Sequence, residues 1–295
     1  MTGPRAAVLF NPAAGRGTAR RVAEQTVRLL GTAGWQAGTV TGRDTVETRA
    51  RAAESVASGA EVLAVVGGDG MVSIGLQAVA GTGTALAVVP AGTGNDFART
   101  LGVPRDDPAA AARLITHGVR RSVDLGRCGD RWFGTVLTSG FDSLVTHRAN
   151  SMTWPRGRAR YNLAIVAELA RLRPLPFTLR VDGREVQTDA TLVAVGNGPS
   201  YGGGMLMCPG ASLSDGRLTV TVVEAVGRSR LVRVFPRVYK GTHTSHPRVR
   251  TYTGRTVEID SPGVLGYADG ELVGDLPLRA ECVPGAVEVM GPRVR

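Results

Sequence analysis

The stretch Glu61–Met71, EVLAVVGGDGM, constrains the fold of this chain more than any other. Its first part, Val62–Val66, is short, continuously apolar and rich in β-branched residues, which is typical of a strand buried on both faces of a parallel sheet. Three glycines and one carboxylate then interrupt the apolar run. Because Met71–Ala80 can form a helix, the stretch is predicted to be a strand, a tight turn and a helix.

The turn Gly67–Gly70 has the features of a phosphate-binding turn. Glycine lets a ligand approach the main-chain N–H groups, and the N-terminus of the following helix attracts anions. Asp69 lies in the middle, and a carboxylate repels phosphates unless a divalent cation stands between them. The turn therefore favours a metal–nucleotide complex as its ligand. The alternative is a tight strand-to-helix turn with an exposed Asp69.

The first third of the chain repeats this order of strand, turn and helix. The predicted strands are Ala6–Phe10, Trp35–Val40, Val62–Val66 and Ala85–Val89, and the helices between them are Thr18–Leu30, Asp44–Ala57 and Met71–Ala80. In the second helix, Asp44 is a plausible N-cap with Glu47 in the capping-box position. Four strands that alternate with helices predict a parallel doubly wound sheet, whose ligands bind beyond the carboxyl ends of the strands.

Polar residues and glycines gather at those predicted carboxyl ends. Asn11, Thr41, Gly67–Gly70 and Gly92–Asn95 each follow one of the four strands. Because the carboxyl ends of parallel strands meet at one edge of a sheet, these residues are expected to form one ligand site.

After a predicted helix at Asp107–His117 the pattern changes to strands separated by turn signals. The predicted strands are Val123–Cys128, Trp132–Asp142, Phe177–Gln187, Thr191–Gly198, Asp215–Val226, Thr256–Ile259, Gly263–Tyr267 and Leu278–Cys282, and two helices interrupt them at Arg158–Leu172 and Ser229–Lys240. Asp182–Gly183 is a hairpin signal. A mostly antiparallel β domain is therefore expected after the α/β domain.

Composition and charge limit the function. With 295 residues, 43% of them apolar, the chain is long enough for two domains with real cores. Cys128, Cys208 and Cys282 lack the spacing of a disulfide framework or a zinc site, so structural thiols are expected. The net charge of +10 suggests an anionic partner: a nucleotide, an anionic membrane or nucleic acid. No helix-turn-helix pattern or aromatic-studded basic strand supports nucleic acid.

Seven sequence blocks, in order, carry a resemblance to a known family. They are NPAAG (Asn11–Gly15), GGDGM (Gly67–Met71), GTGNDFAR (Gly92–Arg99), VDLG (Val123–Gly126), SLSDGRL (Ser212–Leu218), GTHTSHPRV (Gly241–Val249) and DGE (Asp269–Glu271). Together they resemble the bacterial diacylglycerol-kinase-like lipid kinases, which share a catalytic domain with sphingosine and ceramide kinases. The resemblance implies a nucleotide-binding domain at residues 1–125, rejoined by 283–295, a β-sandwich-like lipid-substrate domain at 126–282, and an active site in the cleft between them.

The resemblance also implies roles for particular residues. The nucleotide site would be lined by Asn11, Pro12, Gly15, Thr41, Gly67, Gly68, Asp69, Gly70, Thr93 and Asn95. Asp69 would face the magnesium-bound phosphates, and Asp269 and Glu271 would approach from the second domain, with Glu271 favoured as the proton acceptor. A structural magnesium would be held by Ser212, Asp215 and Arg217, of which Asp215 gives its side chain, and Asp124 would join that network.

The implied function is an ATP- and Mg²⁺-dependent lipid kinase of phospholipid metabolism. It would transfer the γ-phosphoryl group to the hydroxyl of diacylglycerol or a similar lipid alcohol. Two alternatives stay open: an NAD-kinase-like enzyme, since NAD kinases carry a similar GGDG turn, and a non-catalytic nucleotide- or lipid-binding regulator. The non-catalytic regulator is kept as an alternative because Met71 and Ala14 replace hydroxyl residues often found at these positions in the family. His243 and His246 have no partner spacing for a metal site, so a structural or phosphate-neighbouring role is expected.

The expected partner is a lipid substrate at an anionic membrane surface, without nucleic acid or a transmembrane segment. The expected location is cytoplasmic, peripheral at the inner membrane surface; the sequence does not determine the oligomeric state, and a homodimer is kept as one expectation. Arginines mix with aromatic and apolar residues in one stretch, which can dock at an interface. They are Arg156, Arg158 and Arg160 beside Trp154 and Tyr161, and Arg171 and Arg173 flanking Leu172. The alternative is a solvated helix face with a core Trp154.

Overall fold

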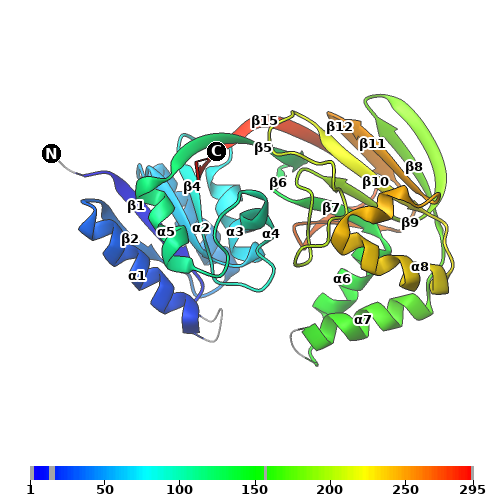
Figure 1. Ribbon diagram of the computed structural model, residues 1–295, viewed down its shortest axis with the longest axis horizontal. Helices are drawn as coiled ribbons and strands as arrows, with labels where there is room; N and C mark the ends of the chain where they lie inside the picture. Colours follow the sequence, from blue (N-terminus) through cyan, green and yellow to red (C-terminus); the bar gives the residue numbers. More distant parts are fainter. Residues whose placement is uncertain (1–2, 13–16, 156–157, 294–295) are drawn as a thin grey trace. The chain divides into compact units, whose positions relative to one another are not determined.

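The computed structural model describes residues 3–12, 17–155 and 158–293 (Figure 1). The chain divides into two compact units. The first unit is Met1–Leu125 with Gly202–Gly204 and Val283–Arg295, and the second is Gly126–Tyr201 with Met205–Cys282.

The first unit is built on a parallel sheet with the strand order β4-β3-β1-β2. Its strands are β1 (Arg5–Phe10), β2 (Gln36–Val40), β3 (Val62–Gly67) and β4 (Ala85–Pro90). The last part of β15 (Leu278–Gly291) adds to this sheet, since Val289 pairs with Leu86 in parallel register. Along the chain, β2 is added on one side of β1 and β3 on the other, so the strand order reverses between β1 and β3. Ligands of doubly wound sheets bind in the crevice at this reversal point. The predicted parallel doubly wound fold is confirmed.

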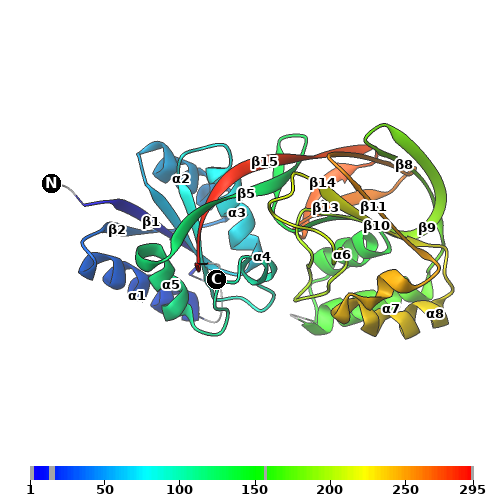
Figure 2. The ribbon, with the colours of Figure 1, turned by 45° about the horizontal axis from the view of Figure 1, so that its top comes forward.

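Helices cover both faces of this sheet, which explains why every residue of β3 is buried. The helices are α1 (Thr18–Thr32), α2 (Thr45–Ala57), α3 (Asp69–Val79), α4 (Asp96–Thr100) and α5 (Pro108–His117). Helix α1 packs against α5, and α2 packs against α3. Figure 2 shows the two pairs on opposite faces of the sheet.

Helix α3 begins earlier than the sequence predicts. Its N-cap is Gly68, so Asp69 and Gly70 lie in the first helical turn rather than in a loop. An acidic residue in the first turn is favourable, because the helix dipole places positive charge there.

The start of α2 confirms one prediction and corrects another. Asp44 is the N-cap, and its Oδ1 accepts a hydrogen bond from the backbone N–H of Glu47 at 2.8 Å. In a capping box the Glu47 carboxylate returns to the N–H of the cap residue. Here its Oε2 accepts from the backbone N–H of Arg43 at 2.9 Å, one residue further back.

The second unit is a mostly antiparallel β structure, as predicted. Its strands are β6 (Arg131–Phe133), β7 (Val136–Gly140), β8 (Leu175–Val181), β9 (Arg184–Gly196), β10 (Leu218–Glu224), β11 (Val249–Gly254), β12 (Thr256–Asp260), β13 (Leu265–Ala268) and β14 (Glu271–Asp275), with β5 (Val119–Cys128) entering it and the first part of β15 pairing with β12. The core between the strands includes Phe133, Phe177 and Leu179, which are almost fully buried. Cys128, Cys208 and Cys282 are buried free thiols.

The β8–β9 hairpin is confirmed. Its two-residue turn is Asp182–Gly183, with φ of 47° and 83°. Both residues therefore adopt the left-handed conformation that a type I′ turn needs. The separate strand predicted at Thr191–Gly198 is wrong, because β9 runs without interruption from Arg184 to Gly196.

The helices of the second unit are only partly predicted. They are α6 (Phe141–Ser151), α7 (Arg158–Ala170), α8 (Arg228–Val234) and the 3₁₀ helices η2 (Phe235–Lys240) and η3 (Thr242–Ser245). Helix α6 was missed, because the strand prediction ran on to Asp142. The strand ends instead at Gly140, whose φ of 89° few other residues adopt. Strands β11 and β14 were also not predicted.

Candidate functional site

Two glycine-rich turns meet at the carboxyl ends of β3 and β4. A Cβ atom added at Gly92 would lie 2.4 Å from the Cα of Gly68, and one added at Gly94 would lie 2.3 Å from Oδ2 of Asp69. These distances are far below a van der Waals contact. The two turns can therefore approach so closely only because glycine occupies both positions.

Asp69 links the two turns. Its Oδ2 accepts a hydrogen bond from the backbone N–H of Asn95 at 2.9 Å, and its Oδ1 accepts one from the N–H of Asp96 at 2.7 Å. The two hydrogen bonds hold the Asp69 carboxylate in a fixed position, in the first turn of α3.

The turn after β4 is fixed by its own side chains and by a distant loop. Asn95 has a φ of 54°, and its amide Nδ2 donates to the carbonyl of Gly92 at 2.9 Å. Asp96 is buried, and its Oδ2 accepts from the backbone N–H of Gly203 at 2.7 Å. The guanidinium of Arg99 donates to the carbonyl of Gly94 at 3.2 Å.

Sequence reasoning missed this contribution of Gly202–Gly204. All three glycines have positive φ values, and the segment belongs to the first unit although it lies between strands of the second. A run of three consecutive glycines was the available signal, since it marks backbone that must adopt special conformations or approach another backbone closely.

A cavity of about 610 Å³ lies beside the carboxyl ends of β1 and β2. It is lined by Asn11, Pro12, Thr41, Gly42, Arg43, Glu47 and Arg51. Thr41 is among the residues carried over from the family resemblance, as are Asn11 and Pro12. The hydroxyl oxygen of Thr41 is buried and has no hydrogen-bond partner within the described part of the chain. Such a group is normally satisfied, so this hydroxyl is available to a ligand in the cavity.

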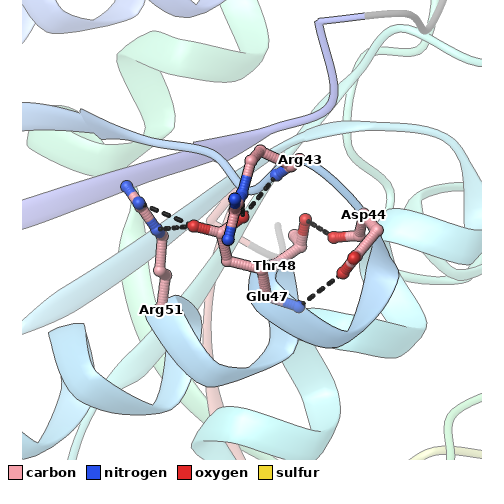
Figure 3. A network of polar contacts seen from close by, with 5 residues as sticks. All are labelled: Arg43, Asp44, Glu47, Thr48 and Arg51. Carbon is pink, nitrogen blue, oxygen red and sulfur yellow. Dashed lines mark hydrogen bonds and ion pairs between the residues drawn. The ribbon is translucent and has the colours of Figure 1, made fainter.

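A network of ion pairs forms one wall of the cavity (Figure 3). The Oε2 of Glu47 accepts from Nε of Arg43 at 2.7 Å, and its Oε1 accepts from Nη2 of Arg51 at 2.7 Å. The Arg43 guanidinium and its backbone N–H, together with Arg51, lower the pKa of Glu47 to about 2. Two cations thus share one carboxylate, and the wall keeps a net positive charge. The sequence prediction of the site did not include these three residues.

Met71 packs against the turn that precedes it. A Cβ atom at Gly67 would lie 2.7 Å from both Cβ and Cγ of Met71, whose side chain is buried. The Met71 side chain therefore fills the space that a side chain at position 67 would need. Thr93 lies exposed in the second turn, whereas Gly15 and Ala14 lie outside the described residues.

In the second unit, Asp269 is held by the turn before β7. Its Oδ2 accepts from the backbone N–H of Gly134 at 2.8 Å, and its Oδ1 accepts from the N–H of Thr135 at 2.9 Å and from the Thr135 hydroxyl. Burial raises the pKa of Asp269, and the bonds from Thr135 and Gly134 oppose this shift. Glu271 begins β14 and is partly exposed. The structure thus gives Asp269 a structural task in holding the turn before β7.

The loop expected to hold a structural magnesium offers one carboxylate. Oδ1 of the exposed Asp215 accepts from the backbone N–H of Arg217 at 3.0 Å, and its Oδ2 has no partner among the residues that the structure describes. No cluster of three or more metal-ligating side chains occurs within the described ranges. The loop therefore fits a hard cation only if backbone carbonyls, such as those of Ser212 and Arg217, complete the ligand set. In the first unit, Asp124 is buried and accepts from the N–H of Gly285 at 2.8 Å.

The stretch expected to dock at an interface exposes its aromatic residues. The Trp154 side chain is 78% exposed, so the alternative of a core tryptophan is wrong. Tyr161, Leu163 and Val166 of α7 are also exposed. Arg156 and the side chain of Arg158 lie outside what the structure describes. Among the described helices, none is long and apolar enough to cross a membrane.

His243 and His246 of the GTHTSHPRV block each make a hydrogen bond to the protein backbone; His243 is buried and His246 is half-buried. The Nε2–H of the buried His243 donates a hydrogen bond to the carbonyl oxygen of Met207 at 3.2 Å, and Nδ1 of His246 accepts one from the backbone N–H of Arg248 at 3.1 Å. Burial lowers the pKa of His243. Both contacts stabilise the loop between η2 and β11.

The fold and the paired glycine-rich turns define a class: proteins in which a doubly wound α/β domain is combined with an antiparallel β domain. Residues 5–128 match the model of the diacylglycerol kinase catalytic domain, and residues 135–291 match the YegS C-terminal NAD kinase beta sandwich-like domain. A diacylglycerol kinase of Mycobacterium tuberculosis is 45% identical over 291 residues, which cover 97% of this chain and 94% of that protein. The chain belongs to the family of diacylglycerol kinase-like lipid kinases.

More distant relatives share the whole length. A diacylglycerol kinase of Bacillus subtilis is 27% identical over 277 residues, covering 92% of this chain and 91% of that one. A crystal structure of a diacylglycerol kinase from Bacillus anthracis has a TM-score of 0.75 at 22% identity and covers 98% of this chain and 96% of its own. An NAD kinase from Archaeoglobus fulgidus in complex with ATP has a TM-score of 0.57 at 14% identity, covering 98% and 94%. The last two show a common fold only.

Proposed function

We propose that this protein is an ATP- and Mg²⁺-dependent lipid kinase that phosphorylates the hydroxyl of diacylglycerol or a similar lipid alcohol. Family membership supports a lipid kinase. The observation that carries the proposal is the position of Asp69, which joins two glycine-rich turns at the carboxyl ends of adjacent parallel strands. That edge of a doubly wound sheet is where nucleotides bind in such folds.

In this proposal the glycine-rich turns receive the phosphates. Gly68 and Gly92 keep the two backbones close together, and Gly70 leaves open space above the first turn of α3. Backbone N–H groups and the N-terminus of α3 would bind the phosphate oxygens. Asp69, with Asn95 beside it, would hold the Mg²⁺, which neutralises the charge that spreads over the transferred phosphoryl group.

The cavity beside β1 and β2 would take the nucleoside part of ATP. Its buried Thr41 hydroxyl supports this, because a hydrogen-bonding group of the ligand would satisfy it. Asn11 and Pro12 line the same cavity, and the positive wall formed by Arg43, Glu47 and Arg51 suits an anionic ligand.

Glu271 is proposed as the group that accepts the proton of the lipid hydroxyl. Both oxygens of Asp269 already accept hydrogen bonds from Gly134 and Thr135, so its removal would disturb the turn before β7. Phosphoryl transfer needs little covalent help, and one positioned base or orienting group is enough. The structural arguments therefore favour Glu271 over Asp269.

The second unit offers features that suit a lipid. A cavity of about 370 Å³ is lined by Phe141, Leu144, Glu168, Arg171, Leu172, Arg173 and Leu175. Its apolar members would contact acyl chains, and its arginines would lie toward phosphate headgroups. A diacylglycerol stays in its bilayer, so we propose a peripheral attachment to an anionic membrane surface from the cytoplasmic side.

The test is a radiolabelled ATP assay in mixed micelles with diacylglycerol, ceramide and sphingosine, and with NAD⁺ as a soluble acceptor. The proposal predicts Mg²⁺-dependent labelling of a lipid, with diacylglycerol preferred, and no labelling of NAD⁺. Labelling of NAD⁺ alone would favour the NAD-kinase alternative. That alternative is included in the test because the chain has the same fold as the NAD kinase from Archaeoglobus fulgidus. ATP binding without any transfer would favour the non-catalytic regulator.

A further inference from the structure

A strongly basic segment of the second unit has no role in the proposed chemistry. Residues Arg228–Lys240, RSRLVRVFPRVYK, form α8 and the following η2 and contain five cations and no acidic residue. We call this segment the basic helix pair. Helix α8 contains no buried residue at all.

The basic helix pair has an inner apolar face that accounts for its attachment to the unit. Leu231, Val234 and Val238 follow one another at spacings of three and four residues, so they share one side of the helical segment. Val238 is buried in a core cluster with Met207 and Cys208. Its carbonyl also accepts a hydrogen bond from the backbone N–H of Leu206 at 3.1 Å.

A second apolar face points away from the core. Val232, Phe235 and Tyr239 repeat the same spacing of three and four residues, and they are 55%, 37% and 51% exposed. The rings of Phe235 and Tyr239 contact each other edge to face, with centroids 6.1 Å apart. A helical segment that is apolar on two sides is normally covered on both, so the outer face is a contact surface that the described part of this chain does not cover.

The cations of the segment are exposed and lack partners. Within residues 3–12, 17–155 and 158–293, no acidic side chain pairs with any of Arg228, Arg230, Arg233, Arg237 and Lys240. Some exposed arginines elsewhere in the protein are paired, as Arg43 and Arg51 are with Glu47. The surface therefore combines uncompensated positive charge with exposed Phe and Tyr rings.

We propose that the basic helix pair docks on the surface of an anionic lipid bilayer. Cations beside aromatic and aliphatic side chains are the composition of an interfacial helix, in which the rings enter the headgroup region and the cations contact anionic lipids. A second copy of the chain fits this face less well, because a symmetric dimer would bring like charges together. Helix α7, which exposes Leu163 and Val166, lies next to α8 in both views (Figures 1 and 2).

This inference rests on the proposed function only in its choice of a bilayer as partner, since a lipid kinase must reach a membrane-bound substrate. Membrane binding itself requires no catalysis. The two proposals can therefore fail separately in an experiment that measures binding without ATP.

The experiment is sedimentation of the full chain with vesicles of phosphatidylcholine alone or mixed with phosphatidylglycerol, at low and at high salt. The test variant is Arg230→Gln, Arg233→Gln and Arg237→Gln together. Its matched control removes the same charge from α1 and α5 of the first unit through Arg21→Gln, Arg28→Gln and Arg113→Gln, which are exposed. Thermal melting of each protein checks that it is folded.

Three cations that each contribute about fivefold to anionic-surface affinity predict a ~100-fold weaker binding of the test variant to anionic vesicles at low salt. The control is expected to lose less than fivefold, and high salt should release the wild type. A second variant, Phe235→Ser with Tyr239→Ser, keeps every charge and is expected to weaken binding to anionic vesicles at low salt, because its side chains no longer enter the headgroup region.

Equal losses in the test and control variants would overturn the proposal, because net charge rather than this segment would then explain binding. Equal binding of the wild type to neutral and anionic vesicles would also overturn it. So would a concentration-dependent dimer that the test variant abolishes without any vesicle binding. If vesicle binding behaves as expected but no lipid is phosphorylated, the docking proposal stands and the proposed function fails.

Discussion

Oδ1 of Asp69 accepts a hydrogen bond from the backbone N–H of Asp96 at 2.7 Å, across a separation of 27 residues in the sequence. This bond joins the first turn of α3 to the first turn of α4. Since each turn follows a strand of the same parallel sheet, the carboxylate fixes the relative position of the two glycine-rich turns. Asp69 therefore has a structural role in addition to the role proposed for it with Mg²⁺.

Replacing Asp69 separates these two roles. We expect Asp69→Ala to lower kcat on the order of a thousandfold, because the group proposed to hold the metal is lost. The same change should lower the free energy of unfolding by about 1–3 kcal/mol, because the N–H groups of Asn95 and Asp96 lose their acceptor. Asp69→Asn keeps one acceptor oxygen and is expected to recover part of the stability but not the activity. Near-normal turnover in either variant would remove Asp69 from the mechanism.

Two glycines of the turns should respond differently to alanine. A Cβ atom at Gly92 meets the Cα of Gly68 at 2.4 Å, whereas one at Gly70 meets no atom within 4 Å. Gly92→Ala is expected to destabilise the protein by about 1–3 kcal/mol through overpacking. Gly70→Ala should keep or raise Tm, because alanine favours the helix, yet weaken ATP binding if the ligand approaches this backbone. Measured Tm and ATP Kd for both variants test this, and unchanged ATP affinity in Gly70→Ala would place the phosphates elsewhere.

The loop at Asp215 is predicted to bind Mg²⁺ in the absence of nucleotide. Because a ligand that binds only the native state stabilises it, the wild-type Tm should rise with Mg²⁺ concentration. Asp215→Ala should abolish this rise and lower activity, since the loop then offers no carboxylate. Asp189→Ala is a suitable control, because it also removes an exposed carboxylate of the second unit. Identical wild-type melting curves with Mg²⁺ and with chelator would contradict a cation site in this loop.

The pKa of Asp269 predicts a pH dependence of stability. Burial raises this pKa in the folded state above its unfolded value of about 3.9. The folded state then binds the proton more tightly, so the contribution of Asp269 to stability is full below about pH 4 and is lost as pH rises through the folded pKa. The free energy of unfolding in urea should therefore be measured for the wild type and Asp269→Asn across this pH range. Relative to Asp269→Asn, the wild type is expected to become less stable as pH rises above 4. A difference that grows in favour of the wild type with pH would mean that the hydrogen bonds from Thr135 and Gly134 outweigh burial.

Much of the first unit could be predicted from the sequence, because its strands and turns are local features. The apolar run Val62–Val66 needs burial on both faces, and only a parallel sheet covered by helices supplies it. The hairpin at Asp182–Gly183 of the second unit could also be predicted, since its turn requires a positive φ at both positions and Asp-Gly is typical of such turns. The fold class could be predicted correctly for this reason.

Other features depend on contacts that no local pattern encodes. The bond from Gly203 to Asp96 spans 107 residues, and only the folded chain brings that glycine run to the turn after β4. Helix α6 was missed because the predicted strand ran on to Asp142, and the sequence does not reveal that Gly140 turns the chain there. The ion pairs of Glu47 with Arg43 and Arg51 could be predicted from their i, i+4 spacing. Their position beside a cavity could not be predicted from the sequence.

The central claim is tested most directly by the initial rate of phosphate transfer from ATP to diacylglycerol in mixed micelles, for the wild type, Glu271→Gln and Asp269→Asn. The account predicts Mg²⁺-dependent transfer by the wild type and a loss of about 10²–10⁴-fold in kcat for Glu271→Gln in protein that remains folded. For Asp269→Asn it predicts a lower Tm and a smaller loss of kcat. Absence of transfer to diacylglycerol and to related lipid alcohols by folded, ATP-binding wild-type protein would contradict the account.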